Sequence, residues 1–332
     1  MGLYPTNSAE ANKYIITDCD CNILVVEDEK ALEKMWLIRN ELPMVKRIIV
    51  YNDTPDKDKY PGVLFWSDVM MLGESQTDKG LEERLANIAI NQCCTLVYTS
   101  GTTGKPKGVM LSHDNIHWTG LVTIEFLQWR EAEEVTISYL PLSHIAANFV
   151  DIWVPIMSKN VVYFADKNAL KGTLLDTLKE VRPTMLFGVP RVWEKIMEGM
   201  MDKGKSIKGF KKKISTACKK AGLEHHVNGK NGLMYSVGQR LIFKNVKYAL
   251  GLDRCNLFFT GAAPISEEAL KYFLSLDIVL LELYGMSEVT GPHTVQFFNA
   301  YKLGTCGKVM QGCKIKLDNS NEKGEGESFQ YN

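Results

Sequence analysis

Segment 98–108 has the residue types most suited to chemistry in this chain: Tyr-Thr-Ser-Gly-Thr-Thr-Gly-Lys-Pro-Lys-Gly. Glycine lets backbone N–H groups turn toward an anion, hydroxyls add further donors, and lysines supply positive charge. The segment follows a short apolar run, 94–97, that is typical of a strand. These residues predict a loop that binds a polyphosphate. The candidate binding residues are Thr99, Ser100, Gly101, Thr102, Thr103, Gly104, Lys105 and Lys107.

Two other interpretations of this segment compete with nucleotide binding. A P-loop requires Ser or Thr directly after Gly-Lys, whereas Pro106 follows Gly104 and Lys105 here. The composition is also compatible with a polar loop that binds nothing. The P-loop is disfavoured, and the choice between a ligand-binding loop and a plain surface loop depends on the rest of the chain.

Four more short motifs follow in the chain, at 139–144, 261–264, 284–288 and 304–307. They read Tyr-Leu-Pro-Leu-Ser-His, Gly-Ala-Ala-Pro, Tyr-Gly-Met-Ser-Glu and Gly-Thr-Cys-Gly. Together with 98–108, and in this order, they resemble the core motifs of the adenylate-forming superfamily. That superfamily includes acyl-CoA synthetases, firefly luciferase-like enzymes and peptide-synthetase adenylation domains.

Two longer stretches narrow the resemblance. Segment 189–195, Val-Pro-Arg-Val-Trp-Glu-Lys, is similar to long-chain acyl-CoA synthetases, and segment 281–293 resembles their bubblegum-type branch. The similarity extends from about Gly2 to Gly326. It implies ATP- and Mg²⁺-dependent activation of a long-chain or very-long-chain fatty acid to an acyl-adenylate and then, with CoA as co-substrate, to acyl-CoA.

The resemblance also implies roles for individual residues. The hydroxyls of the 98–108 segment and Lys107 would hold the β- and γ-phosphates, and Ser287, where the family usually has Thr, would contact the α-phosphate. Glu288 would ligate Mg²⁺, a hard cation that prefers oxygen. The adenine-side residues would be Gly261, Ala262, Ala263, Pro264, Tyr284, Gly285 and Met286.

Two of these assignments have structural alternatives. Tyr284 would lie flat against adenine; the alternative is a core aromatic, which the family spacing of Gly285 and Glu288 disfavours. His144 would orient the acyl carboxylate through a ring N–H, but a lone histidine can also be purely structural. The assignments of Ser287, Glu288 and His144 as catalytic residues therefore depend on the motifs around them.

Composition agrees with a soluble enzyme domain, and the sequence has no apparent membrane-spanning segment. The 332 residues are 45% hydrophobic and 23% charged, enough for one large or two ordinary domains. The formal net charge is zero, so the charge balance does not suggest a nucleic-acid partner. Eight cysteines without metal-site spacing indicate reduced thiols in a cytoplasmic protein. No apolar run approaches the ~20 residues of a transmembrane helix.

Eight lysines between residues 203 and 220 give one region a strong positive charge. They could contact anionic headgroups at a membrane such as the endoplasmic reticulum. A solvated helix face is the alternative. His225 and His226, near Cys218, are interpreted as part of a surface loop and not as a metal site.

Strand-like and helix-like segments alternate along the chain, which predicts an α/β fold with largely parallel sheets and crossover helices. Expected strands are 23–26, 47–51, 135–139, 161–164, 185–188, 257–260 and 278–281, and a small β element is expected at 313–317. Expected helices include 7–16, capped by Asn7, 29–39, and 112–129, capped by Ser112. The loops at Thr99, Gly261 and Tyr284 each follow an expected strand, where open sheets bind their ligands.

The resemblance predicts an incomplete AMP-binding domain over residues 1–327 and a divergent tail at 328–332. Strands that the family places upstream, and a C-terminal domain with a catalytic lysine, are expected to be missing. We therefore expect marginal folding and impaired turnover. The alternative is a catalytically silent protein that binds ATP or acyl chains, or associates with a full-length synthetase.

Overall fold

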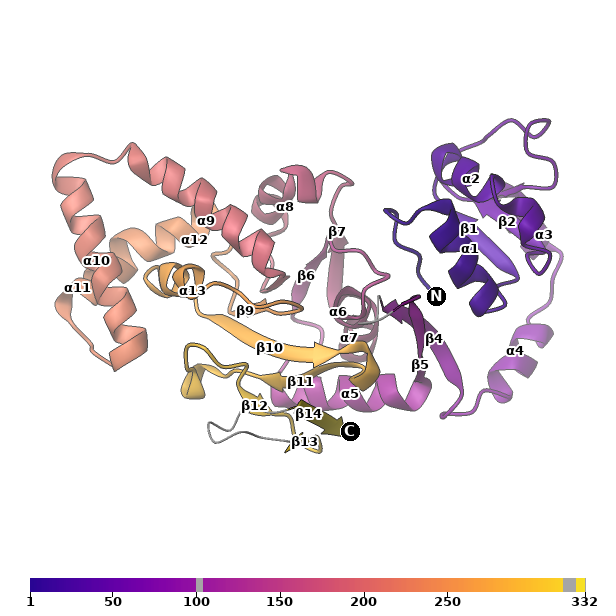
Figure 1. Cartoon of the computed structure of the whole chain (residues 1–332). Coiled ribbons are helices and arrows are strands. Elements are labelled where there is room, and N and C mark those ends of the chain that lie inside the picture. Colours follow the sequence, from indigo (N-terminus) through magenta and orange to yellow (C-terminus); the bar gives the residue numbers. More distant parts are fainter. Residues whose placement is uncertain (100–103, 319–326, 332) are drawn as a thin grey trace. The chain divides into compact units, whose positions relative to one another are not determined.

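The computed structural model describes residues 1–99, 104–318 and 327–331, which divide into two compact units, 1–115 and 116–332 (Figure 1). The first unit contains a three-stranded parallel sheet of β1 (Ile23–Val26), β2 (Arg47–Val50) and β3 (Leu64–Phe65). The predicted strand–helix–strand unit around β1 and β2 is confirmed. The helices of this unit are α1 (Ala9–Asp18), α2 (Glu29–Trp36), η1 (Arg39–Glu41), α3 (Trp66–Glu74) and α4 (Lys79–Ala86).

The start of α1 differs from the prediction. Ser8, not Asn7, is the N-cap, and its hydroxyl accepts from the N–H of Ala11. The Asn7 side chain instead donates to the Asn12 side chain. A serine hydroxyl can reach the orphan N–H groups of the first turn equally well, so a one-residue shift in the cap costs little.

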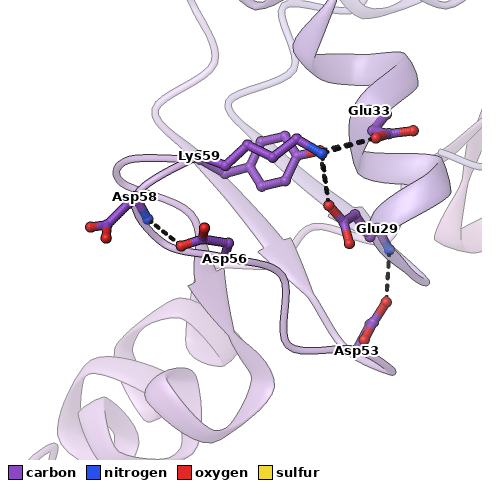
Figure 2. Close-up of polar contacts among 7 residues, drawn as sticks. Glu29, Glu33, Asp53, Asp56, Asp58 and Lys59 are labelled. Atoms are coloured by element: carbon purple, nitrogen blue, oxygen red, sulfur yellow. Dashed lines mark hydrogen bonds and ion pairs between the residues drawn. The ribbon is translucent and has the colours of Figure 1, made fainter.

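A loop between β2 and β3 is tied to α2 by polar contacts (Figure 2). The Lys59 ammonium lies 3.0 Å from Glu29 and 3.1 Å from Glu33, and Asp53 accepts from the N–H of Glu29. The neighbouring Tyr60 ring is buried and its hydroxyl also reaches Glu29. Since exposed ion pairs contribute little, the buried Tyr60 ring is the main anchor of this loop.

The second unit is built on a five-stranded sheet in the order β12-β11-β10-β9-β8. β8, β9 and β10 are parallel, and β11 and β12 continue antiparallel. The strands are β8 (Met185–Gly188), β9 (Leu257–Thr260), β10 (Leu280–Met286), β11 (Gly291–Val295) and β12 (Lys308–Val309). Separate pairs are β6 (Val135–Ser138) with β7 (Val161–Phe164), parallel, and β13 (Lys314–Asp318) with β14 (Glu327–Tyr331), antiparallel.

The predicted α/β class is confirmed, and the expected strands at 161–164, 185–188 and 257–260 have the observed bounds. The predicted limits of the last parallel strand, 278–281, were wrong. β10 starts at Leu280 and continues to Met286, so Tyr284 lies inside a strand and not after one. The strand continues because β11 pairs with its second half, across a register shift between Tyr284 and Gly285.

Alternate side chains of the parallel strands point to two faces of this sheet. Leu186, Phe258 and Leu280 belong to one buried cluster with α9, which we call the α9 face. Phe187, Phe259 and Leu281 belong to another cluster with Phe149 and Val154, which we call the α7 face. Because side chains alternate in direction along each strand, the same strands contribute to two separate hydrophobic cores.

Helices of the second unit surround both faces (Figure 1). Helix α5 (His113–Phe126) starts beside Ser112, whose hydroxyl accepts from Asn115 as predicted, and ends before residue 129, since Gln128 adopts a left-handed conformation. The other helices are α6 (Ile145–Asn148), η2 (Phe149–Trp153), α7 (Val154–Ser158), η3 (Ala169–Lys171), α8 (Leu174–Val181), α9 (Pro190–Lys205), α10 (Gly209–Asn228), α11 (Leu233–Gly238), η4 (Gln239–Phe243), α12 (Lys244–Ala249), α13 (Glu267–Leu274), η5 (Ser287–Val289) and η6 (Phe298–Ala300).

A polar network joins the helices at the α10 end of this unit. The Asp277 carboxylate accepts from Tyr235 at 2.8 Å and lies 3.0 Å from His226 and 3.3 Å from Lys247. His226 lies in the last turn of α10 and not in a surface loop, which corrects that interpretation. No helix among the described residues is long and apolar enough to span a bilayer.

Candidate functional site

The predicted phosphate-binding segment connects the two strands of an antiparallel hairpin, β4 (Cys93–Thr99) and β5 (Lys107–Ser112). Thr99 and Lys107 form the last pair of the ladder. Ser100, Gly101, Thr102 and Thr103 lie outside the described residues. Thr99, Gly104, Lys105 and Lys107 are therefore the predicted residues that the structure places at this hairpin end.

Packing around the hairpin explains several of its residues. Tyr98 donates to Asp18 at 2.6 Å, and a Cβ on the opposing Gly108 would come within 2.9 Å of the Tyr98 ring. The Lys105 ammonium lies 4.9 Å from the centre of the Tyr14 ring. Gly104 has φ +105°, a conformation that favours glycine.

The predicted adenine-side segment lies in the second unit, at the carboxyl end of β10. Tyr284 is 40% exposed, which overturns the alternative of a core aromatic. The adjacent Gly285 is required sterically, because a Cβ there would lie 1.7 Å from the Gly291 carbonyl oxygen of β11. Ser287 is buried, whereas Glu288 is exposed in the short turn η5. The turn thus presents a carboxylate just beyond the strand end.

The predicted adenine-side loop 261–264 begins directly after β9, the parallel neighbour of β10. Gly261 is buried, and a Cβ there would come within 2.6 Å of the Leu283 side chain. Ala262, Ala263 and Pro264 are exposed, and Ala262 has φ +67°. The two segments predicted to flank one adenine therefore lie at the ends of neighbouring strands, as ligand sites in parallel sheets do.

His144 lies at the N-terminal end of helix α6. It is the N-cap of α6, where its Nδ1 accepts from the N–H of Ala146 at 3.1 Å. Burial lowers the pKa of His144, which favours the neutral ring. Because Nδ1 is an acceptor, the neutral ring carries its proton on Nε2. The helix cap thus prepares an Nε2–H donor.

A small pocket on the α7 face brings three predicted segments together. His144, Ala262 and Gly285 line it together with Gly291 and Pro292, and its volume is about 70 Å³. They come from the start of α6, the loop after β9 and strand β10. The sequence had predicted these residues for one site. The hairpin at Thr99 belongs to the other unit.

The comparisons with known proteins decide the family. The sequence profile of the AMP-binding enzyme family matches residues 1–328. This chain belongs to the AMP-binding enzyme family.

Relatives of this AMP-binding chain include bubblegum-type ligases, which confirms the predicted branch. The long-chain-fatty-acid–CoA ligase ACSBG2 of Xenopus laevis is 48% identical over 98% of this chain and 45% of its own length. The human ACSBG2 is 46% identical, with 98% and 50% covered, and the rat ACSBG1 is 42% identical, with 98% and 46% covered. The chain thus spans about half the length of these relatives.

Solved structures show the same fold. The anthranilate CoA ligase AuaEII in complex with anthranoyl-AMP has a TM-score of 0.63 and 16% identity, covering 98% of this chain and 52% of that protein. ATP-bound MatB from Rhodopseudomonas palustris also gives 0.63, with 18% identity and the same coverage. At these identities the likeness establishes the architecture of the AMP-binding domain.

Glu288 is the carboxylate predicted to hold Mg²⁺ in this AMP-binding chain. Mg²⁺ is commonly held by one or two protein carboxylates and by substrate phosphates. No cluster of three metal-ligating side chains occurs among the described residues. The exposed carboxylate of Glu288, beyond the end of β10, fits a site in which the nucleotide supplies the remaining oxygens.

Two kinds of residues near this pocket were missed by the sequence analysis. Apolar side chains complete the pocket, among them Phe149 and Phe187, and no local pattern marks them as pocket residues. Asp151 in η2 is a half-buried carboxyl near Tyr139. Burial raises the pKa of Asp151 to about 7, although the Ser138 hydroxyl acts in the opposite direction. An acidic residue within an apolar stretch was the available signal.

Proposed function

We propose that this chain forms the nucleotide- and acyl-binding part of a long-chain fatty acid:CoA ligase. It would activate the fatty acid with ATP to an acyl-adenylate, which CoA then converts to acyl-CoA. The observation that carries the proposal is the pocket shared by His144, Ala262 and Gly285. The names of the relatives support a long-chain fatty acid as the substrate.

Activation joins two anions, so the protein must provide donors and positive charge. Thr99, Lys107 and the hydroxyls of segment 100–103 would hold the β- and γ-phosphates, and Ser287 would contact the α-phosphate. Mg²⁺ bound through Glu288 would neutralise phosphate charge. Tyr284, exposed at the strand end, would stack on the adenine opposite the 261–264 loop.

His144 would position the acyl carboxylate. Its Nε2–H is the free donor of the ring, because Nδ1 is occupied by the N-cap contact. A neutral donor can hold a carboxylate oxygen without forming a full ion pair, which leaves the other oxygen reactive toward the α-phosphate. The low pKa caused by burial keeps this donor neutral at physiological pH.

Fatty-acid-dependent exchange of pyrophosphate into ATP tests the adenylation step. We expect exchange with oleate, ATP and Mg²⁺, and a loss of about 100-fold or more in Glu288→Ala. Glu268→Ala is the matched control, since Glu268 is an exposed glutamate in the first turn of α13. Formation of oleoyl-CoA on addition of CoA tests the second step.

Nucleotide or acyl binding without exchange would instead support the silent binding protein. If a folded sample, verified by circular dichroism, shows neither binding nor exchange, both functions are refuted. Peripheral contact of the lysines between residues 203 and 220 with a membrane such as the endoplasmic reticulum stays a prediction, and co-sedimentation with anionic vesicles tests it.

A further inference from the structure

Helix α1 contacts the β4–β5 hairpin on both sides of its connection. Asp18, the last residue of α1, accepts from the hydroxyl of Tyr98 near the end of β4. The Tyr14 ring lies 4.9 Å from the ammonium of Lys105, which precedes β5. Tyr14 and Asp18 are four residues apart and therefore lie on the same face of the helix. One face of α1 thus touches the hairpin before and after its connection.

The core of the first unit fixes the position of this helix. Asn12, Ile15 and Ile16 of α1 are buried, and Ile16 packs in the same hydrophobic cluster as Leu24 of β1. The Ser8 hydroxyl caps the first turn. A helix that is capped and packed along one side does not have to be ordered again when a ligand arrives, so it can serve as a rigid support.

The Tyr98 side chain is held tightly between the hairpin and α1. Its ring is 6% exposed and lies over Gly108, its partner in the ladder, where a Cβ would come within 2.9 Å of the ring. Its hydroxyl lies 2.6 Å from the Asp18 carboxylate. Burial raises the pKa of Tyr98, and the bond to Asp18 adds to this, so the phenol keeps its proton and donates.

Asp18 is unfavourable for its own helix. The C-terminal end of a helix has a partial negative charge, which repels a carboxylate there. Aspartate also has a lower helix propensity than most residues, and the last turn of α1 has no basic residue to compensate. The stabilising contact of Asp18 that reaches another element is the bond to the Tyr98 hydroxyl. This bond gives the hairpin a charged acceptor that a neutral helix end does not provide.

We propose that Asp18 is a positioning residue for the predicted phosphate-binding hairpin. It fixes Tyr98 and, through the backbone, the adjacent Thr99, whose ladder partner is Lys107. Binding groups that are already in place lose less conformational freedom when a polyphosphate binds. The inference rests on the proposed role of this hairpin in ATP binding, and it adds a helix that none of the predicted motifs contains.

Three substitutions separate the bond from the helix that provides it. Asp18→Leu removes the acceptor, while leucine favours the helix and removes the charge from its C-terminal end. Asp18→Asn keeps an oxygen that can accept from Tyr98. Tyr98→Phe removes the donor and keeps the ring. Glu10→Leu is the matched control, because Glu10 is an exposed acidic residue of the same helix, in its first turn.

The experiment measures the binding of Mg-ATP to the full chain by calorimetry, and the KM values for ATP and oleate in pyrophosphate exchange. We expect Asp18→Leu and Tyr98→Phe each to raise the Kd and the KM for ATP about five- to tenfold. The kcat should change less than about twofold, because the lost binding is common to the ground and transition states. The KM for oleate should not change.

Asp18→Asn should recover the affinity for ATP to within about threefold of the parent, because its amide oxygen still accepts a hydrogen bond. Glu10→Leu should bind ATP as the parent does. The double variant Asp18→Leu/Tyr98→Phe should bind ATP no more weakly than either single variant, because both changes remove the same bond.

Unchanged ATP affinity in Asp18→Leu would overturn the inference, as would losses that add in the double variant. Equal increases in the KM for ATP and for oleate would indicate a general structural effect and also overturn it. A parent chain that binds Mg-ATP without exchange would refute the ligase function, while the binding data still decide the role of Asp18. A parent that binds no Mg-ATP would refute both.

Discussion

The two faces of the parallel strands β8, β9 and β10 are built from alternate residues of the same segments, yet they differ in what they can hold. The α7 face has a pocket of about 70 Å³ where His144, Ala262 and Gly285 converge. The α9 face has a cavity of about 800 Å³ lined by apolar and basic side chains. Strand ends and a helix cap thus bring polar groups to the small pocket, whereas helix packing creates the larger space.

The pKa values of two carboxyl groups, Asp151 and Asp277, are shifted in opposite directions. Asp151, in the turn that leads to α7, has a pKa raised to about 7 by burial. Burial would also raise the pKa of Asp277 at the α10 end, but His226, Lys247 and Tyr235 lower it to about 2. The difference is the presence of charged and hydrogen-bonding partners, which the sequence spacing of neither residue reveals.

The largest loss of stability should come from a substitution in the hydrophobic core of the α9 face. Trp193 is fully buried, packs edge-on against Phe273, and donates from Nε1 to the Phe259 carbonyl at 3.0 Å. Trp193→Ala should lower the free energy of unfolding by about 3–5 kcal/mol. Urea unfolding followed by circular dichroism measures this. Trp66→Ala is the control, because the Trp66 side chain is half exposed. A loss in the free energy of unfolding below about 1 kcal/mol in Trp193→Ala would contradict the packing.

The raised pKa of Asp151 predicts a pH-dependent stability. Between about pH 4 and 7 the unfolded state loses this proton while the folded state keeps it, so the contribution of Asp151 to stability falls across that range. Asp151→Asn removes the loss, and should be roughly 2–4 kcal/mol more stable relative to the parent at pH 8 than at pH 4.

Urea titrations of parent and Asp151→Asn at the two pH values give this difference directly. Asp277→Asn is the opposite control, since the stabilisation by Asp277 is present above about pH 4 and is lost as the pH falls toward 2. Asp277 has φ +61°, which asparagine also tolerates. If the difference in unfolding free energy between Asp151→Asn and the parent does not change with pH, the raised pKa of Asp151 is contradicted.

Two glycines give the smallest pair of effects, with opposite signs. Gly285→Ala places a Cβ against the Gly291 carbonyl and should cost about 1–3 kcal/mol, because β10 and β11 must separate. Gly199→Ala enters open space inside α9 and should gain about 0.5–1 kcal/mol from helix propensity. Urea unfolding of both variants decides the comparison, and a Gly285→Ala variant as stable as the parent would refute the close approach.

Sequence reasoning succeeded best for buried strands and less well at their ends. The runs that became β7, β8 and β9 are short and mostly apolar, and each starts directly after a polar residue, Asn160, Thr184 or Asn256. The second half of β10 was not predicted, because Tyr284 and Gly285 are typical of a turn and become a strand only through pairing with β11. β5 was not predicted, since Pro106 and Gly108 are typical of a loop.

The sequence by itself determined the chemistry available at each motif: hydroxyls and lysines at 99–107, a histidine at 144, and a carboxylate at 288. Their residue types and linear order were sufficient to identify the family. Tertiary structure alone decided that His144 shares a pocket with Gly285, and that α8, α9 and α10 enclose a cavity with a cationic border. Both depend on contacts between segments far apart in the chain, which close packing establishes and local spacing does not encode.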